Sequence, residues 1–326
     1  MAIATNTSLT YSSVAIREDL SDVIYNIAPM DTPFMSGCAK TTADNTFFEW
    51  QTDSITAGAA NRKIEGDDSI AADARVLPTR LGNYCQISQY VNQTSGTDQV
   101  MNYAGHGKHQ AYQLAKNGKR MKRDMESMLT QNIVRAAGDS TEARATAGIP
   151  AWLNTSHVAG GSGGSADAGS LGTTAMVNNT STAAASETNI KATIKECYDA
   201  GGSPDMMLVP SNVKQTISAL SQTVSELRTS ANKEAPASVV AAVDVYVSDF
   251  GTFKIVPDRN LAKDGPGSVA ANIFFLDMDY WAIAWLRPFQ TVDLAKTGDA
   301  VKQMLVAEYG LVSKNEASSG ILASVS

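Results

Sequence analysis

The segment between residues 46 and 95 limits most strongly what this chain can fold into. Its first part, 46–55, is rich in the β-branched and aromatic residues that favour strands. A glycine-punctuated, charged stretch follows over 57–68, and residues 81–94 predict a second strand. One face of that strand carries Tyr84, Gln86, Ser88, Tyr90 and Asn92, and the other carries Cys85, Ile87, Gln89 and Val91. A long two-stranded hairpin buries little of its own surface, so we expect this one to need a partner to lie on.

Length and composition bound the rest of the molecule. With 326 residues, 43% of them apolar, the chain can form one large or two modest cores and is not disordered overall. It has no run of about 18 apolar residues, so we predict no membrane-spanning helix and no membrane partner. Residues 1–7 lack a basic region and a long apolar stretch, which argues against a secretory signal.

The cysteines indicate the redox state. Cys38, Cys85 and Cys197 are odd in number and far apart, and no Cys-x-x-Cys occurs. This pattern favours three reduced thiols in a cytoplasmic product, with a disulfide or a reactive thiol as the alternative.

A long amphipathic helix is predicted between residues 98 and 138. Its apolar side chains recur at spacings of three, four and seven: Leu114, Met121, Met125, Met128, Leu129, Ile133 and Val134. We expect the helix to run from residue 109 to residue 137, about 43 Å at 1.5 Å per residue, and to stop at Gly138. A stripe of methionine and leucine is typical of a core-facing surface rather than of a ligand site.

The N-terminal segment, the region over 159–185 and the remainder of the chain differ in composition and in hydrophobic pattern. Residues 1–16 are polar and predict a flexible arm, and a short helix over 13–24 is expected to end before Pro29. Residues 159–185 are rich in Gly, Ala, Ser and Thr, which predicts an exposed, mobile loop. From residue 187 the pattern is α/β, with helices over 188–200 and 210 to about 225 or 228, and strands over 206–209, 239–247, 251–257, 272–286 and 301–312.

The histidines offer the first test for a metal site. His106 and His109 are spaced so that both imidazoles can lie on one helix face, but the only other histidine is His157. Zinc sites need three or four ligands with supporting contacts. We therefore interpret the pair as two surface histidines at a helix start, and we predict no metal site.

Motifs for phosphate binding and catalysis are incomplete. The glycines over 160–165 are not followed by the Lys-Ser/Thr of a nucleotide-binding loop, and no Gly-x-Ser-x-Gly elbow occurs. Asp67 and Asp68 lie in a predicted loop, and Asp277 with Asp279 is expected to form one polar face of a strand. We predict no catalytic residue, no cofactor-binding residue and no enzyme activity.

A basic run on the long helix is a candidate for contact with nucleic acid. It comprises Lys116, Lys119, Arg120, Lys122 and Arg123, and Asp124 and Glu126 follow it. We favour a solvated face with intrahelical ion pairs; weak contact with nucleic acid or with a neighbouring subunit is the alternative. A net charge of −7 argues against a protein whose main task is to grip DNA phosphates.

Four segments, in order along the chain, carry a resemblance to a known family. They are 17–36, which includes the run Ala28-Pro29-Met30-Asp31-Thr32-Pro33-Phe34, then 81–87, 120–124, and 308–317 with Gly320. Together they resemble the SU10-like major capsid, or major head, proteins of tailed bacteriophages, which have an HK97-like fold. Ser318 and Ser319 stand where the family pattern has a histidine-containing pair, and residues 158–186 resemble an insertion.

The resemblance implies an α+β, HK97-like capsid fold with a peripheral domain and an α/β axial domain. The implied parts are an N-terminal arm over 1–45, an extended β-hairpin loop over 46–95, a long spine helix with the first part of the peripheral domain over 96–157, a flexible insertion over 158–186, the axial domain over 187–285 and a C-terminal return to the peripheral domain over 286–326. Gly58, Gly66 and Gly82 are expected hinges of the extended loop.

For function, the resemblance implies a major capsid protein that assembles as pentamers and hexamers into an icosahedral shell around double-stranded DNA. The protein is then expected in the virion, after assembly in the host bacterial cytoplasm. Copies of the same chain would be its partners, with scaffolding, portal and decoration proteins as further candidates and packaged DNA contacted only non-specifically. Some HK97-like shells crosslink through a lysine of the extended loop; Lys63 lies in that region, but the sequence shows no acceptor. Another self-assembling shell, a phage tail component and an enzyme of unknown class are the alternatives.

Overall fold

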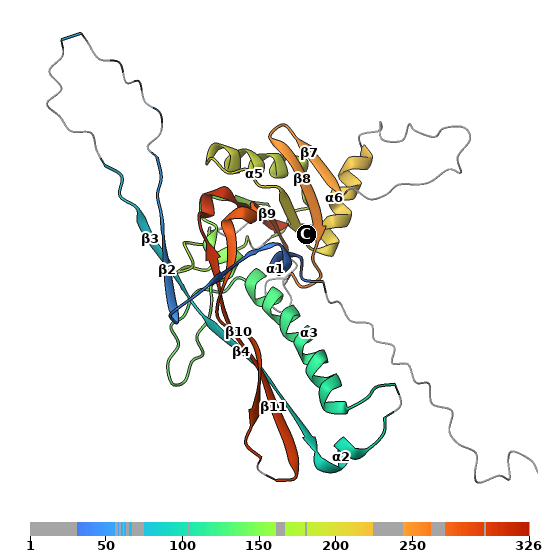
Figure 1. Cartoon of the computed structure of the whole chain (residues 1–326). Helices are drawn as coiled ribbons and strands as arrows, with labels where there is room; N and C mark the ends of the chain where they lie inside the picture. The colour runs from blue at the N-terminus through green and yellow to red at the C-terminus, as the bar shows by residue number, and fades with distance from the viewer. Residues whose placement is uncertain are drawn as a thin grey trace, which may run out of the picture.

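The computed structural model describes residues 31–55, 58, 60, 62, 65, 66, 75–103, 105–160, 167–179, 181–223, 244–261, 271–296 and 298–325. These residues form three sheets with helices packed against them (Figure 1). None of their helices is long and apolar enough to span a membrane. The helix expected over 13–24, Asp67, Asp68 and Lys63 lie outside the described residues.

The predicted hairpin is present, but it is shorter than expected. Strands β2 (Phe47–Thr52) and β3 (Thr79–Tyr84) pair antiparallel with each other alone and project from the body (Figure 1). The single strand expected over 81–94 is wrong, because the chain changes partner at Cys85, whose N–H bonds to the carbonyl oxygen of Thr46. Strand β4 (Gln86–Ser95) then joins the body, so the extended loop does not continue to residue 95.

A four-stranded sheet has the order β1-β10-β11-β4. Strand β1 (Ala39–Thr42) runs parallel to β10 (Trp281–Leu294), which pairs antiparallel with β11 (Ala300–Ser313), and β11 with β4. The face alternation predicted for β4 is confirmed: Ser88 and Tyr90 are half-buried, whereas Ile87 and Val91 are exposed.

The long helix begins at residue 109, as predicted, but it ends earlier than predicted. A short helix α2 (Gly96–Val100) precedes α3 (His109–Thr130), whose Met121, Met125 and Leu129 are buried. The helix stops at Thr130 rather than at 137 because other segments bind the next backbone groups: the Ile133 carbonyl accepts from the N–H of Gly148 and the Arg135 N–H donates to Gly172. Gly138, the predicted stop, lies in a later turn with φ of 69°. Helix α4 (Ile149–Trp152) follows, and all its residues are buried.

A six-stranded sheet has the order β5-β12-β9-β6-β8-β7. These strands are β5 (Ser156–Ala159), β12 (Gly320–Val325), β9 (Ala271–Leu276), β6 (Met206–Val209), β8 (Gly251–Pro257) and β7 (Val245–Ser248). Helices α5 (Glu187–Asp199) and α6 (Ser211–Thr223) pack against it. The helix predicted over 188–200 is confirmed as α5, whose buried face carries Ile190, Ile194 and Cys197 at spacings of four and three. The Ser186 side chain caps this helix by accepting from the N–H of Asn189.

The strand expected over 272–286 is wrong: it is two strands in two sheets. A 3-10 turn, η2 (Met278–Tyr280), separates β9 from β10, and the Asp277 carboxylate accepts from the N–H of Asp279. The two aspartates therefore form a turn and not one polar face of a strand. The chain crosses between the sheets again at η3 (Glu316–Ser318), and β12 returns to the six-stranded sheet. Consequently, the expected boundary at 285/286 falls inside β10, and residues 286–326 do not all return to one sheet.

Much of the Gly, Ala, Ser and Thr-rich segment packs on the body, so the expectation of an exposed loop over 159–185 is wrong for its buried residues, which include Gly169, Gly172, Met176 and Ala185. Met176 is buried, and the Asn132 side chain bonds both the N–H and the carbonyl of Met176, at 3.0 and 2.6 Å. Small residues make this approach feasible: a Cβ on Gly169 would lie 2.8 Å from Cα of Ala151. Small residues are typical of flexible loops, and composition alone does not show that here they allow close backbone packing.

The part of the expected N-terminal arm that the structure describes, residues 31–45, packs against the rest of the same chain. Helix α1 (Pro33–Gly37) begins with a proline and packs against α3, and Phe34 is fully buried with its ring 6.0 Å from that of Trp281. Strand β1 follows and extends the four-stranded sheet. Residues 31–45 are thus part of the folded body.

Candidate functional site

The far end of the described hairpin exposes apolar side chains. Ile55, just after β2, is 99% exposed, and Leu77, just before β3, is 77% exposed. Val76 beside it is also exposed. Large exposed apolar groups that gather on a projecting element are typical of an interaction surface.

The base of the hairpin is fixed to the body by aromatic packing. The rings of Phe48 and Trp50 stack at 5.8 Å, and Trp50 lies 5.4 Å from the buried Trp152. Gly310 of β11 makes room for this base, since a Cβ there would come 2.7 Å from Cζ of Phe48. Gly82 has a similar role against Phe47, which makes it a packing position rather than the expected hinge.

A buried asparagine completes the base. The Asn83 side chain donates to the Thr146 hydroxyl at 2.9 Å and to the Leu311 carbonyl at 2.8 Å, and it accepts from the N–H of Ala147. Asn83 is fully buried, so these bonds hold the hairpin in one direction. The sequence signal was the segment 81–87, but its alternation gave no hint that residue 83 turns inward.

A second apolar surface crosses the open face of the four-stranded sheet. Val292, Met304 and Val91 lie opposite one another on β10, β11 and β4, and therefore share one face. Val91 is 51% exposed, and Ile87 on the same face is also exposed. Ile87 borders a hollow of about 410 Å³ whose rim includes the acidic side chains of Asp139 and Glu142.

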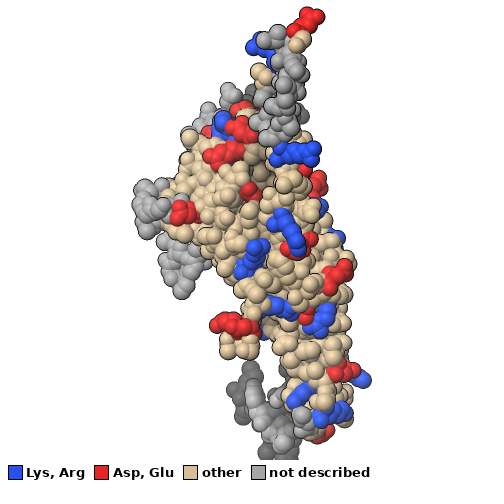
Figure 2. All heavy atoms as spheres, turned by 90° about the vertical axis from the view of Figure 1, so that its left-hand side faces the viewer, with Lys and Arg blue, Asp and Glu red and all other residues tan. Residues whose placement is uncertain are grey.

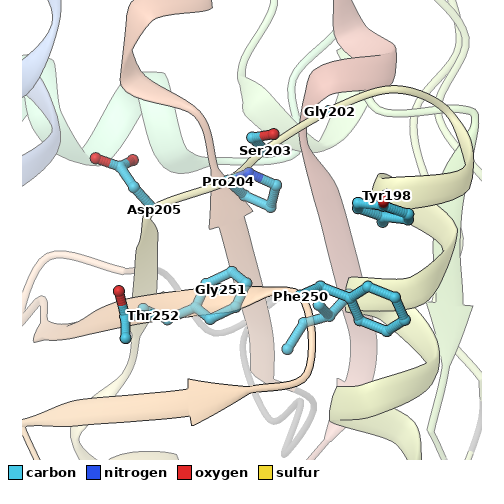
Figure 3. Close-up of a pocket in the computed structure, with 10 residues that line it drawn as sticks. Tyr198, Gly202, Ser203, Pro204, Asp205, Phe250, Gly251 and Thr252 are labelled. Atoms are coloured by element: carbon cyan, nitrogen blue, oxygen red, sulfur yellow. The ribbon is translucent and has the colours of Figure 1, made fainter.

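A third surface lies at the far edge of the six-stranded sheet. Val245 and Val247 of the edge strand β7 are exposed, and the rings of Tyr198 and Phe250 lie 4.8 Å apart. These two rings line one side of a hollow of about 200 Å³ between α5 and the β7–β8 turn, with Asp205 on its other side (Figure 3).

The basic run on α3 has the predicted solvated character, with partial ion pairing. Arg120 and Arg123 pair with Asp124 at 3.8 and 3.7 Å, and Arg120 also lies over the Tyr90 ring at 4.6 Å. Lys116, Lys119 and Lys122 are exposed and form no ion pair within the part of the chain that the structure describes. On the face that Figure 2 shows, basic and acidic side chains are interspersed rather than separated.

The two helix-start histidines are half-buried and contact each other and two tyrosines. Nε2 of His106 lies 3.1 Å from Nδ1 of His109, and Tyr103 and Tyr112 pack on these imidazoles. His157 lies elsewhere, on β5, and burial lowers its pKa. Within the described ranges no cluster of three or more His, Cys, Asp or Glu side chains could hold a metal ion.

All three cysteines are free and buried. Burial raises the pKa of Cys85 and of Cys197 to about 11 and raises that of Cys38 further. The thiols therefore stay protonated at neutral pH and are poor nucleophiles. The described residues thus bring together exposed apolar surfaces and the packed base of the hairpin.

The sequence matches the profile of the SU10 major capsid protein family over residues 3–326. It is 28% identical to the major capsid protein of Escherichia phage Phieco32, over 96% of each chain. Among solved structures, the fold is similar to the cyanophage A-1(L) capsid asymmetric unit, with a TM-score of 0.67 and 12% identity over 95% of this chain and 97% of that one. It is also similar to the capsid of the native GTA particle, with a TM-score of 0.61 and 12% identity over 99% and 100%.

These comparisons confirm the expected HK97-like α+β fold and set aside the alternatives of a tail component and an enzyme. The three exposed apolar surfaces are therefore those of a structural protein that self-assembles into the shell of a tailed phage. The chain belongs to the SU10 major capsid protein family.

Proposed function

We propose that this protein assembles as pentamers and hexamers into an icosahedral shell that encloses double-stranded DNA, and that its β2–β3 hairpin lies across a neighbouring copy. The observation that carries the proposal is the exposure of Ile55 and Leu77, at 99% and 77%, at the end of a two-stranded hairpin. A hairpin of this kind gains stability when a second surface covers it.

The open face of the four-stranded sheet supports the role of receiving surface. It carries the apolar row Val91, Met304 and Val292, with Asp139 and Glu142 near its Ile87 end. The hairpin carries the exposed Ile55, Val76 and Leu77, so apolar side chains of the two surfaces can cover one another. Contacts of modest strength between many copies let misplaced subunits leave, while their combined effect holds the closed shell together.

We further propose a division into two structural domains. The four-stranded sheet with α3 forms the peripheral domain, and the six-stranded sheet with α5 and α6 forms the axial domain around the pentamer and hexamer axes. The exposed Val245, Val247 and Phe250 at the edge of the six-stranded sheet support contact between copies there.

Further partners belong to the same proposal. Scaffolding, portal and decoration proteins act with the shell. Assembly takes place in the host bacterial cytoplasm, a reducing compartment in which three free, buried thiols stay reduced.

Packaged DNA contacts the shell non-specifically at most. The net charge of −7 supports this, because DNA binding through phosphates usually needs an excess of basic side chains.

The double substitution Ile55→Ser with Leu77→Ser tests the hairpin. Burial of one such side chain contributes roughly 1.5–3 kcal/mol, so losing two weakens each contact by about 100-fold or more in association constant. We expect soluble, folded subunits with an unchanged circular dichroism spectrum and few or no shells by sedimentation and electron microscopy. Deletion of residues 55–72 should give the same result.

Val177→Ser is the matched control. Val177 is 47% exposed on a loop of the body, so its removal should leave the yield of shells unchanged. Normal shells from the hairpin variants would show that the hairpin does not lie on a neighbour. An equal loss in Val177→Ser would show that the effect is not particular to the hairpin.

A further inference from the structure

A buried carboxylate joins the N-terminal helix to the long helix. Glu126 of α3 is fully buried, and its Oε1 accepts from the N–H of Phe34 at 2.7 Å while its Oε2 accepts from the N–H of Met35 at 2.8 Å. Both amides lie in the first turn of α1, where no intrahelical carbonyl can reach them. One side chain thus supplies both partners that this turn lacks.

The groups around Glu126 are acidic or neutral. Cys38 follows α1 and is buried, and Asp258, after β8, is 2% exposed with an Oδ2 that has no hydrogen-bond partner among the described residues. Asp258 Oδ1 accepts from the N–H of Asn260, whose side chain donates to the carbonyl of Asp31. On α3 itself, Lys122 is exposed and Arg123 pairs with Asp124. No cation in the described ranges pairs with Glu126 or Asp258.

This arrangement makes the charge of Glu126 costly. Burial raises its pKa to about 7, and the nearby Asp258 adds to the rise, although the two backbone donors oppose it. Burial likewise raises the pKa of Asp258. If α1 leaves α3, Glu126 gains access to water and returns toward its ordinary value near 4.5. The docked state therefore holds a proton that the undocked state releases.

We propose that Glu126 is a proton-linked latch: it holds α1 on α3 most firmly in acid and loosens as the pH rises toward neutral. The sign follows from linkage. Docking is strongest below a pH of about 4.5, weakens by up to tenfold per pH unit up to about 7, and changes no further above it, where both states are ionised. Because β1 follows α1 directly, loosening the latch also weakens the attachment of the strand beside β10.

Amide hydrogen exchange of the full-length protein between pH 5 and pH 8 tests the latch. After correction for the intrinsic pH dependence of exchange, protection of the peptide over 33–38 should fall at least tenfold between pH 5 and pH 7 and then level off. A peptide from the buried strand β12 serves as the internal reference and should not follow this curve. In Glu126→Gln, which keeps the shape but cannot ionise, protection of 33–38 should be flat across the same range.

Two further variants keep the test decisive. Glu187→Gln removes an exposed carboxylate on α5 and should retain the parent curve. Asp258→Asn removes the neighbouring negative charge and should move the fall in protection to lower pH, even if Glu126→Gln folds poorly. A parent protein with no pH dependence at 33–38, a Glu126→Gln curve equal to the parent, or an Asp258→Asn curve at an unchanged pH would each overturn the proposal.

Discussion

At the scale of single residues, buried polar side chains tie together parts of the chain that are far apart in sequence. Ser319 is the clearest case, because its hydroxyl accepts from the Trp281 indole at 2.9 Å and from the N–H of Asp277 at 3.2 Å. It thereby joins the two points at which the chain crosses between the sheets. The closing motif drew attention to Ser318 and Ser319, but spacing alone assigns them no contact.

Substitution of Ser319 tests this joint. In Ser319→Ala the two donors lose their shared acceptor, and the Trp281 indole N–H stays buried without a partner, so we expect a loss of about 2 kcal/mol in the free energy of unfolding. Urea denaturation of unassembled subunits measures it. Ser54→Ala, at an exposed position, should change the same free energy by less than about 0.5 kcal/mol, and equal effects of the two would contradict the role of Ser319.

At the scale of elements, periodicity predicts what one element buries, but it does not show where a strand changes partner. The buried face of α5 follows from spacings of three and four, and the two faces of β4 follow from a spacing of two, because side-chain direction depends on local geometry; for β4, however, the face with Ile87 and Val91 is the exposed one. The breaks at Cys85 and at 277–280 were missed, since the alternation of side chains typical of a strand continues across both. Hydrogen bonds from distant segments fix these breaks, as they fix the end of α3.

The sequence predicted the candidate surfaces only in part, as it did the helices and strands. The need of the hairpin for a partner was expected from its lack of self-contact, and the alternation of β4 placed Ile87 and Val91 on one face without showing that this face is exposed. The row that adds Val292 and Met304 depends on the register of three strands, which a single sequence does not reveal. The contact of Glu126 with residues 34 and 35 lies across 92 and 91 positions and was likewise out of reach.

Helix α3 contains a glycine that can be replaced. Gly118 is half-buried in mid-helix, and a Cβ there would meet only Cδ2 of Leu305, at 4.0 Å. Gly118→Ala should therefore stabilise the subunit by about 0.5–1 kcal/mol, because glycine in a helix interior has more freedom to lose on folding. Thermal unfolding measures the change. Gly310→Ala is the contrasting variant, in which a clash with the Phe48 ring should destabilise, and a stabilised Gly310→Ala would contradict the packing described here.

At the scale of the whole molecule, we expect the shell to be held by non-covalent contacts. The three thiols are buried and protonated, and Lys63 has no acceptor that the sequence identifies. Boiled particles should therefore run as monomers on denaturing gels, with or without reducing agent. A ladder of higher bands that persists under reduction would contradict this expectation and indicate isopeptide crosslinks.

The position of β12 has a consequence for biosynthesis. All six of its residues are buried, and it lies between β5 and β9, which come from much earlier in the chain. The larger sheet therefore cannot close until residues 320–325 have left the ribosome. Before that moment β5 and β9 lack the strand that joins them, so completion of the larger sheet, and with it entry into a growing particle, waits for residues 320–325.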